Sequence, residues 1–257
     1  MNTIQKCKHG LIIFNRKDSY IGKCLDNYGE FLENQIELLK NFIKEDSVIY
    51  DIGANIGALT LAYARLVPKG SVFAFEPERH SFYSLCGNVA INNLQNIYCY
   101  PYAIGKESGT IFVPDLDHEQ MSDHGWIDLT QKYNCNGYNA VITTIDSIKS
   151  KCCNILKINC CGMEIDALQG GLETINANKP YIILNNYPKN NSNTLIELIK
   201  SLDYKAYFVR KEFYNENNFY ENKNNLFLTK NYDNLFCYPK DLKFNPEIIK
   251  KFDLVAV

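Results

Sequence analysis

The stretch VIYDIGANIGALTLAYA, residues 48–64, decides the fold that we predict for this chain of 257 residues. Its first five residues are mostly apolar and β-rich, its centre holds two glycines, and its last seven are typical of a helix. Glycine permits a tight turn and a close approach of a ligand to the backbone. The start of a helix adds unpaired N–H groups and a positive dipole end. The turn between this strand and this helix is therefore a candidate binding site.

The alternation of strand and helix continues along the chain. The next elements are predicted as strands 71–75, 97–103, 155–159 and 181–184, with helices 58–67, 79–93, 164–175 and 194–202 between and after them. Such alternation indicates an α/β fold whose sheet is mostly parallel, with helices on both faces. Residues 205–209, 226–229 and 235–238 are strand-like without helices between them, which predicts an antiparallel C-terminal edge.

Two regions depart from this pattern. Residues 1–46 are predicted as an N-terminal extension, with a hairpin or irregular segment at 9–32 and a helix from Glu33 to Lys44; residues 47–257 then form one domain. Residues 114–138 are polar and aperiodic, which indicates an insertion that acts as a lid or binds a substrate.

Composition excludes several classes of protein. A net charge of −2 gives no basic face for nucleic acid. No segment approaches the ~20 apolar residues of a membrane span, and the N-terminus lacks the apolar stretch of a signal peptide, so we expect a cytoplasmic protein. The ten cysteines form no C-x-x-C pair and no Cys/His cluster at zinc spacing, so no metal site is predicted. The oligomeric state stays open.

The turn at 51–57 reads D-x-G-x-N-x-G, which is neither the dinucleotide fingerprint nor a P-loop. This disfavours an NAD-dependent oxidoreductase. Glu76 ends the next strand, close to the distance at which a carboxylate meets ribose hydroxyls in related folds. A carboxylate can accept both hydrogen bonds of a ribose diol. The pair fits a nucleoside without a pyrophosphate, and S-adenosylmethionine is such a ligand.

Several motifs resemble, in the same order, those of the FkbM family of methyltransferases. They are VIYDIGANIGALTLAYA, VFAFEPERHSFYSLCGNVAINNLQNI, YAIGKESGTIFV, TTIDSI (143–148) and ILKINCCGMEIDALQGG (155–171), and the match runs from about Val48 to Asn185. The resemblance implies a class I, Rossmann-like methyltransferase fold. It also implies methyl transfer from S-adenosylmethionine to a hydroxyl oxygen of a sugar, glycan or related small metabolite.

The resemblance also assigns cofactor contacts by position. The turn after the first strand would surround the methionine and ribose portions, Glu76 would hold the ribose hydroxyls, and Ala103 and Ile104 would lie against the adenine. The cofactor-binding residues expected from the turn, the strand ends and the resemblance are Asp51, Gly53, Ala54, Asn55, Gly57, Glu76, Pro77, Ala103, Ile104 and Asn159.

The chain departs from the family where acids are expected at the strand ends. The usual K-I-D-x-E-G-x-E is here KINCCGME, residues 157–164, so Asn159 and Cys161 replace acids. Asn185 replaces the glutamate that often follows the fifth strand. An amide can accept a hydrogen bond but cannot take a proton. A general base typically contributes ~10²- to 10⁴-fold in rate, so its loss would leave a slow enzyme.

Three interpretations stay open. The base has moved to Glu164, His118 or His124; the substitutions were introduced to change the site; or the chain is a catalytically weak or inactive S-adenosylmethionine-binding protein. A loop histidine is often only solvated, and an acid at a helix start also stabilises the helix dipole. The candidate catalytic residues are therefore Asn159, Cys161, Glu164, His118 and His124.

Overall fold

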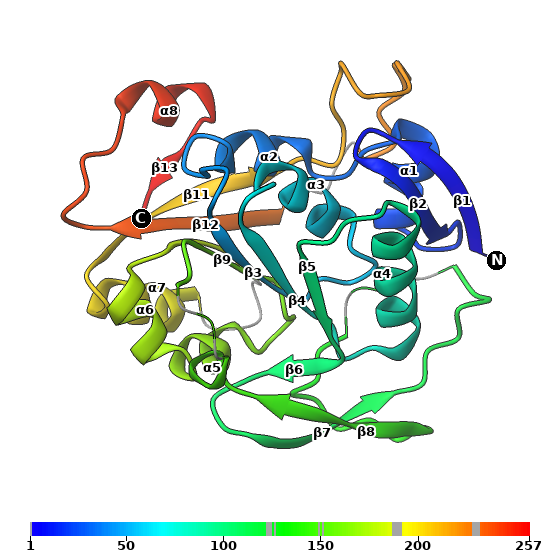
Figure 1. Cartoon of the computed structure of the whole chain (residues 1–257), viewed down its shortest axis with the longest axis horizontal. Coiled ribbons are helices and arrows are strands. Elements are labelled where there is room, and N and C mark those ends of the chain that lie inside the picture. Colours follow the sequence, from blue (N-terminus) through cyan, green and yellow to red (C-terminus); the bar gives the residue numbers. More distant parts are fainter. Residues whose placement is uncertain are drawn as a thin grey trace.

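An eight-stranded sheet forms the centre of the molecule (Figure 1). The computed structural model describes residues 2–121, 125, 127–148, 150, 152–186, 192–227 and 232–257. In spatial order the strands are β13 (Val255–Ala256), β11 (Tyr204–Lys211), β12 (Tyr232–Pro239), β10 (Tyr181–Asn185), β9 (Ile155–Ile158), β3 (Val48–Ile52), β4 (Ser71–Phe75) and β5 (Ile97–Tyr100). The strands from β10 to β5 are parallel, and β12, β11 and β13 form an antiparallel edge. The predicted sheet is thus confirmed.

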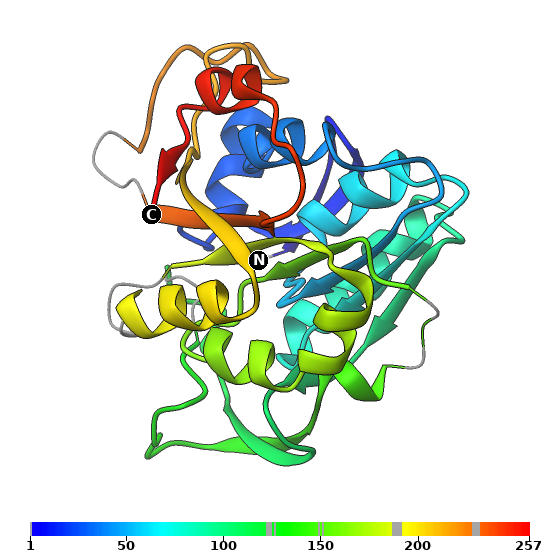
Figure 2. The ribbon, with the colours of Figure 1, turned by 90° about the vertical axis from the view of Figure 1, so that its left-hand side faces the viewer.

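Helices cover both faces of this sheet (Figures 1 and 2). One face carries α2 (Glu33–Leu39), α3 (Ala58–Leu66) and α4 (Arg79–Ile91), and the other carries α5 (Glu164–Gln169), α6 (Leu172–Asn178) and α7 (Ser192–Ser201). Alternate strand residues point to opposite faces. In β10, Ile183 joins the first core, whereas Ile182 and Leu184 join the second. No helix in the described ranges has the length and apolar character needed to cross a bilayer.

The predicted strand 97–103 is two strands, because Pro101 has no N–H for a sheet ladder. β5 ends before it, and β6 (Tyr102–Ile104) joins a second sheet with β8 (Gly137–Thr143) and β7 (Gly109–Pro114). Likewise, the predicted helix 164–175 is broken at Gly170-Gly171 into α5 and α6. A Cβ on Gly170 would lie 2.1 Å from the carbonyl oxygen of Gly105, so the chain passes too closely for a side chain.

The tail of the chain also corrects the sequence interpretation. Leu226 and Phe227 are not in a strand, residues 228–231 lie outside the described residues, and the antiparallel partner of β10 is β12 from Tyr232. The helix expected to reach Lys44 ends at Leu39. Short elements that the periodicity did not reveal are the 3-10 helix η1 (Ile145–Ser147) and the helix α8 (Pro246–Lys251).

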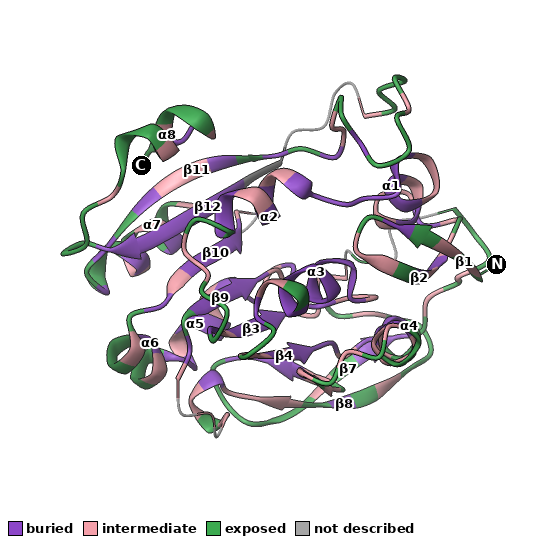
Figure 3. Ribbon diagram, turned by 45° about the horizontal axis from the view of Figure 1, so that its top comes forward, coloured by how far each residue is buried: buried purple, intermediate pink, exposed green. Residues whose placement is uncertain are grey.

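The N-terminal region packs on the domain through buried amides. It consists of a hairpin of β1 (Asn2–Cys7) and β2 (Gly10–Asn15), then α1 (Ile21–Tyr28), where only a hairpin or irregular segment was expected. Figure 3 shows the hairpin beside α4. The fully buried Asn88 of α4 accepts a hydrogen bond from the backbone N–H of Ile13 at 2.6 Å and donates to its carbonyl at 3.1 Å. It also donates to the carbonyl of Ile56 at 2.8 Å, so one side chain joins the hairpin to the turn after β3.

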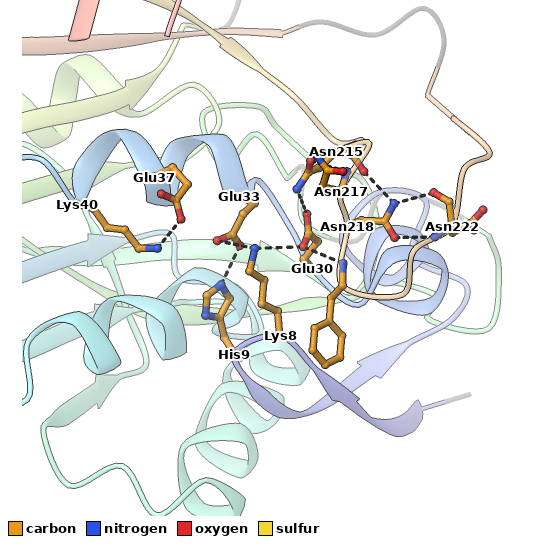
Figure 4. A network of polar contacts seen from close by, with 11 residues as sticks. Lys8, His9, Glu30, Glu33, Glu37, Lys40, Asn215, Asn217, Asn218 and Asn222 are labelled. Carbon is orange, nitrogen blue, oxygen red and sulfur yellow. Dashed lines mark hydrogen bonds and ion pairs between the residues drawn. The ribbon is translucent and has the colours of Figure 1, made fainter. Parts of the chain in front are cut away.

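The Asn-rich stretch 215–225 is held by a polar network rather than only solvated (Figure 4). The buried Glu30 carboxylate accepts hydrogen bonds from the Asn215 side chain at 2.8 Å and from the backbone N–H of Phe219 at 3.1 Å. Asn218 is 2% exposed and donates to two carbonyls inside the loop. This loop therefore packs over the segment between α1 and α2.

Candidate functional site

The turn after β3 is pressed against the ends of two neighbouring strands. Gly53, Asn55 and Gly57 have left-handed φ angles of 70°, 51° and 83°. The N–H groups of Gly53 and Ala54 both donate to the carbonyl of Phe75 at 3.0 Å, which ties the turn to β4. A Cβ on Gly53 would lie 1.9 Å from the carbonyl oxygen of Asn159. Only glycine therefore fits between β3 and the chain that leaves β9.

Glu76 holds this turn from the end of β4. Its carboxylate accepts from the backbone N–H of Asn55 at 2.8 Å and from that of Glu78 at 2.9 Å. Burial raises the pKa of Glu76 to about 7, although the two backbone hydrogen bonds act in the opposite direction. A carboxylate has about four lone-pair sites, so two remain for a ligand diol.

Asp51 and Lys157 form an ion pair beneath the turn. Asp51 is completely buried, its Oδ1 lies 2.8 Å from Lys157 Nζ, and Thr60 donates to its Oδ2 at 2.6 Å. Lys157 also donates to the carbonyl of Gly53 at 2.6 Å. Asp51 was predicted to contact the cofactor, but it lies behind the turn and lines none of the cavities described below. Its chemistry is to hold Lys157 and the first turn of α3.

Gly57 also lies behind the turn. It is the N-cap residue of α3 and is buried, and a Cβ there would meet Leu85 of α4 at 2.6 Å. It lines none of the three cavities that meet at the strand ends. Gly57 was predicted to contact the cofactor, but it instead allows α3 and α4 to pack closely.

A cleft of about 560 Å³ opens at the carboxyl ends of β3 and β4. It brings together eight of the predicted site residues: Gly53, Asn55, Glu76, Pro77, Ala103, Ile104, Asn159 and Cys161. Val113, Ile127 and Leu129 add an apolar wall from β7 and the connection to β8. A buried carboxylate beside apolar walls fits a ribose with its base.

An adjoining cavity of about 440 Å³ shares Gly53, Asn55 and Glu76 with the cleft. Ala54 lines it, as predicted for a cofactor contact, and so does Lys157. Lys157 was not among the residues predicted from the sequence to form the site. A lysine inside the apolar strand ILKI was a usable signal, because a charge in a fully buried strand needs a buried partner.

A third cavity, of about 370 Å³, lies at the ends of β9 and β10; we call it the acceptor cavity. It is lined by Asn159, Cys161, Asn185 and Lys211, and by the aromatic side chains of Tyr20, Phe31 and Phe213. The Nδ2 atom of Asn185 is buried and has no hydrogen-bond partner. The sulfur of Cys161 lies 3.9 Å from the carbonyl of Gly125, in the β7–β8 connection.

Two of the proposed catalytic bases lie away from these cavities. Glu164 is 2% exposed and accepts from the backbone N–H of Gly162 at 3.0 Å, so it closes the turn before α5. His118 lies beside α4, where its ring packs on that of His80 with centroids 4.4 Å apart. Neither lines the cleft or the acceptor cavity. The structure therefore places neither side chain where a general base for these cavities would lie, and His124 lies outside the described residues.

His118 instead approaches Glu78, which caps α4. The two side chains are 3.7 Å apart, and Glu78 accepts from the backbone N–H groups of His80 and Ser81. Burial raises the pKa of Glu78, but His118 and these backbone groups outweigh it and bring the pKa to about 2. The possible metal-ligand atoms of Glu78, His80 and His118 lie within 4.8 Å of one another. His118 thereby anchors the insertion to the start of α4.

This chain is similar to known methyltransferases. A family model described as "Methyltransferase FkbM domain" matches residues 51–217. "Methyltransferase 1" of Beauveria bassiana (strain ARSEF 2860) is 24% identical over 167 residues, which are 55% of this chain and 66% of that protein. The chain thus spans less than two thirds of this relative.

Solved methyltransferases share the fold. A methyltransferase FkbM from Methylobacillus flagellatus KT superposes with a TM-score of 0.52 and 17% identity, over 76% of this chain and 44% of that one. The precorrin-6y C5,15-methyltransferase of Geobacter metallireducens GS-15 gives 0.50 and 13%, over 81% and 87%. The predicted class I, Rossmann-like methyltransferase fold is confirmed.

Proposed function

This chain belongs to the family of FkbM methyltransferase domains, and on that premise we propose that it transfers a methyl group from S-adenosylmethionine to an oxygen atom of a small or glycan-like acceptor. One observation carries the proposal. The turn at 53–55 and the Glu76 carboxylate converge on one cleft, which Ala103 and Ile104 close from the side. The hydroxyl of a sugar or related metabolite is the acceptor that the family resemblance implies.

The residues of the cleft have separable roles. Glu76 accepts hydrogen bonds from the ribose hydroxyls while it holds the backbone of Asn55. Ala103, Ile104 and Val113 exclude water beside the adenine. Asn159, between the cleft and the acceptor cavity, accepts a hydrogen bond from the ammonium of the methionine portion. When bound, S-adenosylmethionine supplies an electrophilic methyl group on a sulfonium; the chain aligns the acceptor oxygen with it.

The second candidate function is binding of S-adenosylmethionine with weak or no catalysis. The observation that favours it is the set of neutral side chains at Asn159, Cys161 and Asn185, with Glu164 and His118 placed elsewhere. Turnover with a methyl-labelled cofactor separates the two functions, because only the enzyme transfers label to an acceptor.

Calorimetry with S-adenosylmethionine and S-adenosylhomocysteine tests the binding itself. We expect both to bind the wild type and Glu76→Ala to bind ~10- to 100-fold more weakly, since hydrogen bonds to a charged group contribute ~1.5–3 kcal/mol. The matched control is Glu107→Ala, which removes an exposed acid in the turn between β6 and β7. A wild type that binds neither compound, or binds NAD equally well, contradicts the proposed function.

A further inference from the structure

The acceptor cavity has the polarity of a site for an anion. The described residues with polar side chains along its wall are Asn159, Asn185, Cys161, Tyr20 and Lys211. No carboxylate is among the described residues that line it. Lys211 is only 6% exposed, so its charge acts in a poorly solvated place. These groups favour a negatively charged guest and give no acid to repel it.

Asn185 adds a specific reason to expect an acceptor atom there. It is 3% exposed, and its Nδ2 atom is buried without a partner. Its neighbour across the sheet, Asn234, is already occupied because it donates to Gln35 Oε1 at 3.1 Å. A buried donor without an acceptor is unfavourable, so a ligand oxygen placed beside Asn185 satisfies it.

The parallel register places a second amide beside the first. Leu184 of β10 pairs with Ile158 of β9, so Asn185 and Asn159 follow at neighbouring strand ends. Phe31 and Phe213 also line the cavity, with ring centroids 6.0 Å apart, and Lys211 Nζ lies 6.0 Å from the centre of the Phe213 ring. Amide donors and a cation together with two aromatic rings fit a ring that carries a charged oxygen group.

We propose that the reacting oxygen belongs to a carboxylate on a ring-bearing small molecule, such as a uronic acid, so that the product is a methyl ester. This inference rests on the methyl transfer proposed above. A lone pair of the carboxylate oxygen forms the bond to the methyl carbon, while the carbon–sulfur bond breaks and its electron pair stays on sulfur. The negative charge of the acceptor and the positive charge of the sulfonium both disappear, and no proton is transferred.

This step explains why acids are dispensable at the strand ends. An alcohol must lose a proton during attack, which calls for a base. Amides are not bases at neutral pH, and an ammonium is only a donor. A carboxylate with an ordinary pKa of about 4 arrives ionised and needs no base. Asn159, Asn185 and Lys211 would then orient the nucleophile rather than activate it.

The test compares acids with neutral partners of the same shape. The full chain is incubated with methyl-labelled S-adenosylmethionine and glucuronate, galacturonate or benzoate, against glucose, galactose or benzyl alcohol. We expect label on the acids only, and we expect mild alkali to release it as methanol, because esters hydrolyse and ethers do not. Label that alkali cannot release overturns the inference but leaves methyl transfer intact. Absence of cofactor binding in calorimetry defeats the proposed function itself.

Acceptor binding gives a readout that does not depend on turnover. With S-adenosylhomocysteine present, we expect glucuronate or another acid of the panel to bind at least about tenfold tighter than its neutral partner. Lys211→Met should remove this preference and Lys211→Arg should keep most of it, whereas Lys200→Met, an exposed lysine of α7, should change nothing. If Lys211→Met fails to fold, Asn185→Leu replaces it. Equal binding of acid and neutral partner, or no binding of any acid, overturns the inference.

Discussion

The cofactor cleft and the acceptor cavity share Asn159 and Cys161 but are built differently. In the cleft, backbone groups and buried charges fix each other: Glu76 holds Asn55, and Lys157 holds Gly53. In the acceptor cavity, the amides of Asn159 and Asn185 and the cationic Lys211 come from the ends of separate strands, and the Nδ2 atom of Asn185 has no hydrogen-bond partner. The groups around the cleft thus bind one another, whereas the acceptor cavity keeps a donor that a ligand oxygen would satisfy.

The largest expected effect comes from the buried pair under the cleft. Lys157→Met leaves Asp51 buried without its partner, and removing one member of such a pair costs about 3–5 kcal/mol. Denaturant unfolding measures the loss, and adding Asp51→Asn should recover part of it. Lys205→Met, an exposed lysine of β11, is the control. An unchanged free energy of unfolding for Lys157→Met would show that this scaffold is not held by charge.

A steric change at the same turn should come next. Gly53→Ala places a Cβ against the carbonyl of Asn159 in a left-handed conformation, so we expect a loss of ~2–4 kcal/mol and no detectable cofactor binding. Gly109→Ala is the matched control, since the nearest atom to its Cβ would lie at an ordinary 3.9 Å. Normal cofactor binding by Gly53→Ala would mean that the turn relaxes and does not define the cleft.

Introducing acids into the acceptor cavity tests which kind of acceptor it binds, because the rate of methyl transfer should fall for a carboxylate acceptor and rise for a hydroxyl acceptor. Asn159→Asp and Asn185→Asp should each lower transfer to glucuronate by about tenfold, because a like charge repels a carboxylate acceptor. If the acceptor were a hydroxyl, the new carboxylate would act as a base and turnover with the neutral panel would rise. Asn193→Asp, on the exposed surface of α7, should alter neither rate.

The smallest effect concerns pH. The folded-state pKa of Glu76 is raised to about 7 from an ordinary 4.5, so the folded chain binds this proton more tightly than the unfolded chain. Stability of the ligand-free protein should therefore fall modestly as pH rises from 4.5 through 7. Cofactor affinity should rise several-fold over the upper part of this range, because the ionised carboxylate is the better acceptor. Melting scans with and without S-adenosylhomocysteine measure both trends, and both should flatten in Glu76→Gln.

The difference between the cleft and the acceptor cavity also explains which parts of the site could be predicted from the sequence. The strand, turn and helix at 48–64 are local, so glycine spacing and one strand-end acid located the cleft. Glu76 lines it, and so do Ala103 and Ile104, which only the family resemblance had placed beside the adenine. Asp51 and Gly57 belong to the same motif but stabilise the fold around the turn. A sequence motif alone does not distinguish residues that contact the cofactor from residues that hold the turn in place.

The acceptor cavity could not be assembled in advance. Tyr20 and Phe31 come from the N-terminal region and Phe213 from the segment after β11, and no local periodicity connects them. His118 was a reasonable base by chemistry, yet the insertion carries it to Glu78. The breaks at Pro101 and Gly170 were readable from residue type alone.

Asn88 has a consequence for anyone who recombines these proteins. The Asn88 amide forms hydrogen bonds with the backbone of both Ile13 and Ile56. The N-terminal hairpin and the cofactor turn are therefore coupled structurally and should be exchanged together. A chimera that takes the hairpin from a relative should also take the matching face of α4. Otherwise the junction between the two parent sequences disrupts these hydrogen bonds. We then expect weaker binding of S-adenosylmethionine, although the exchanged hairpin itself does not contact it.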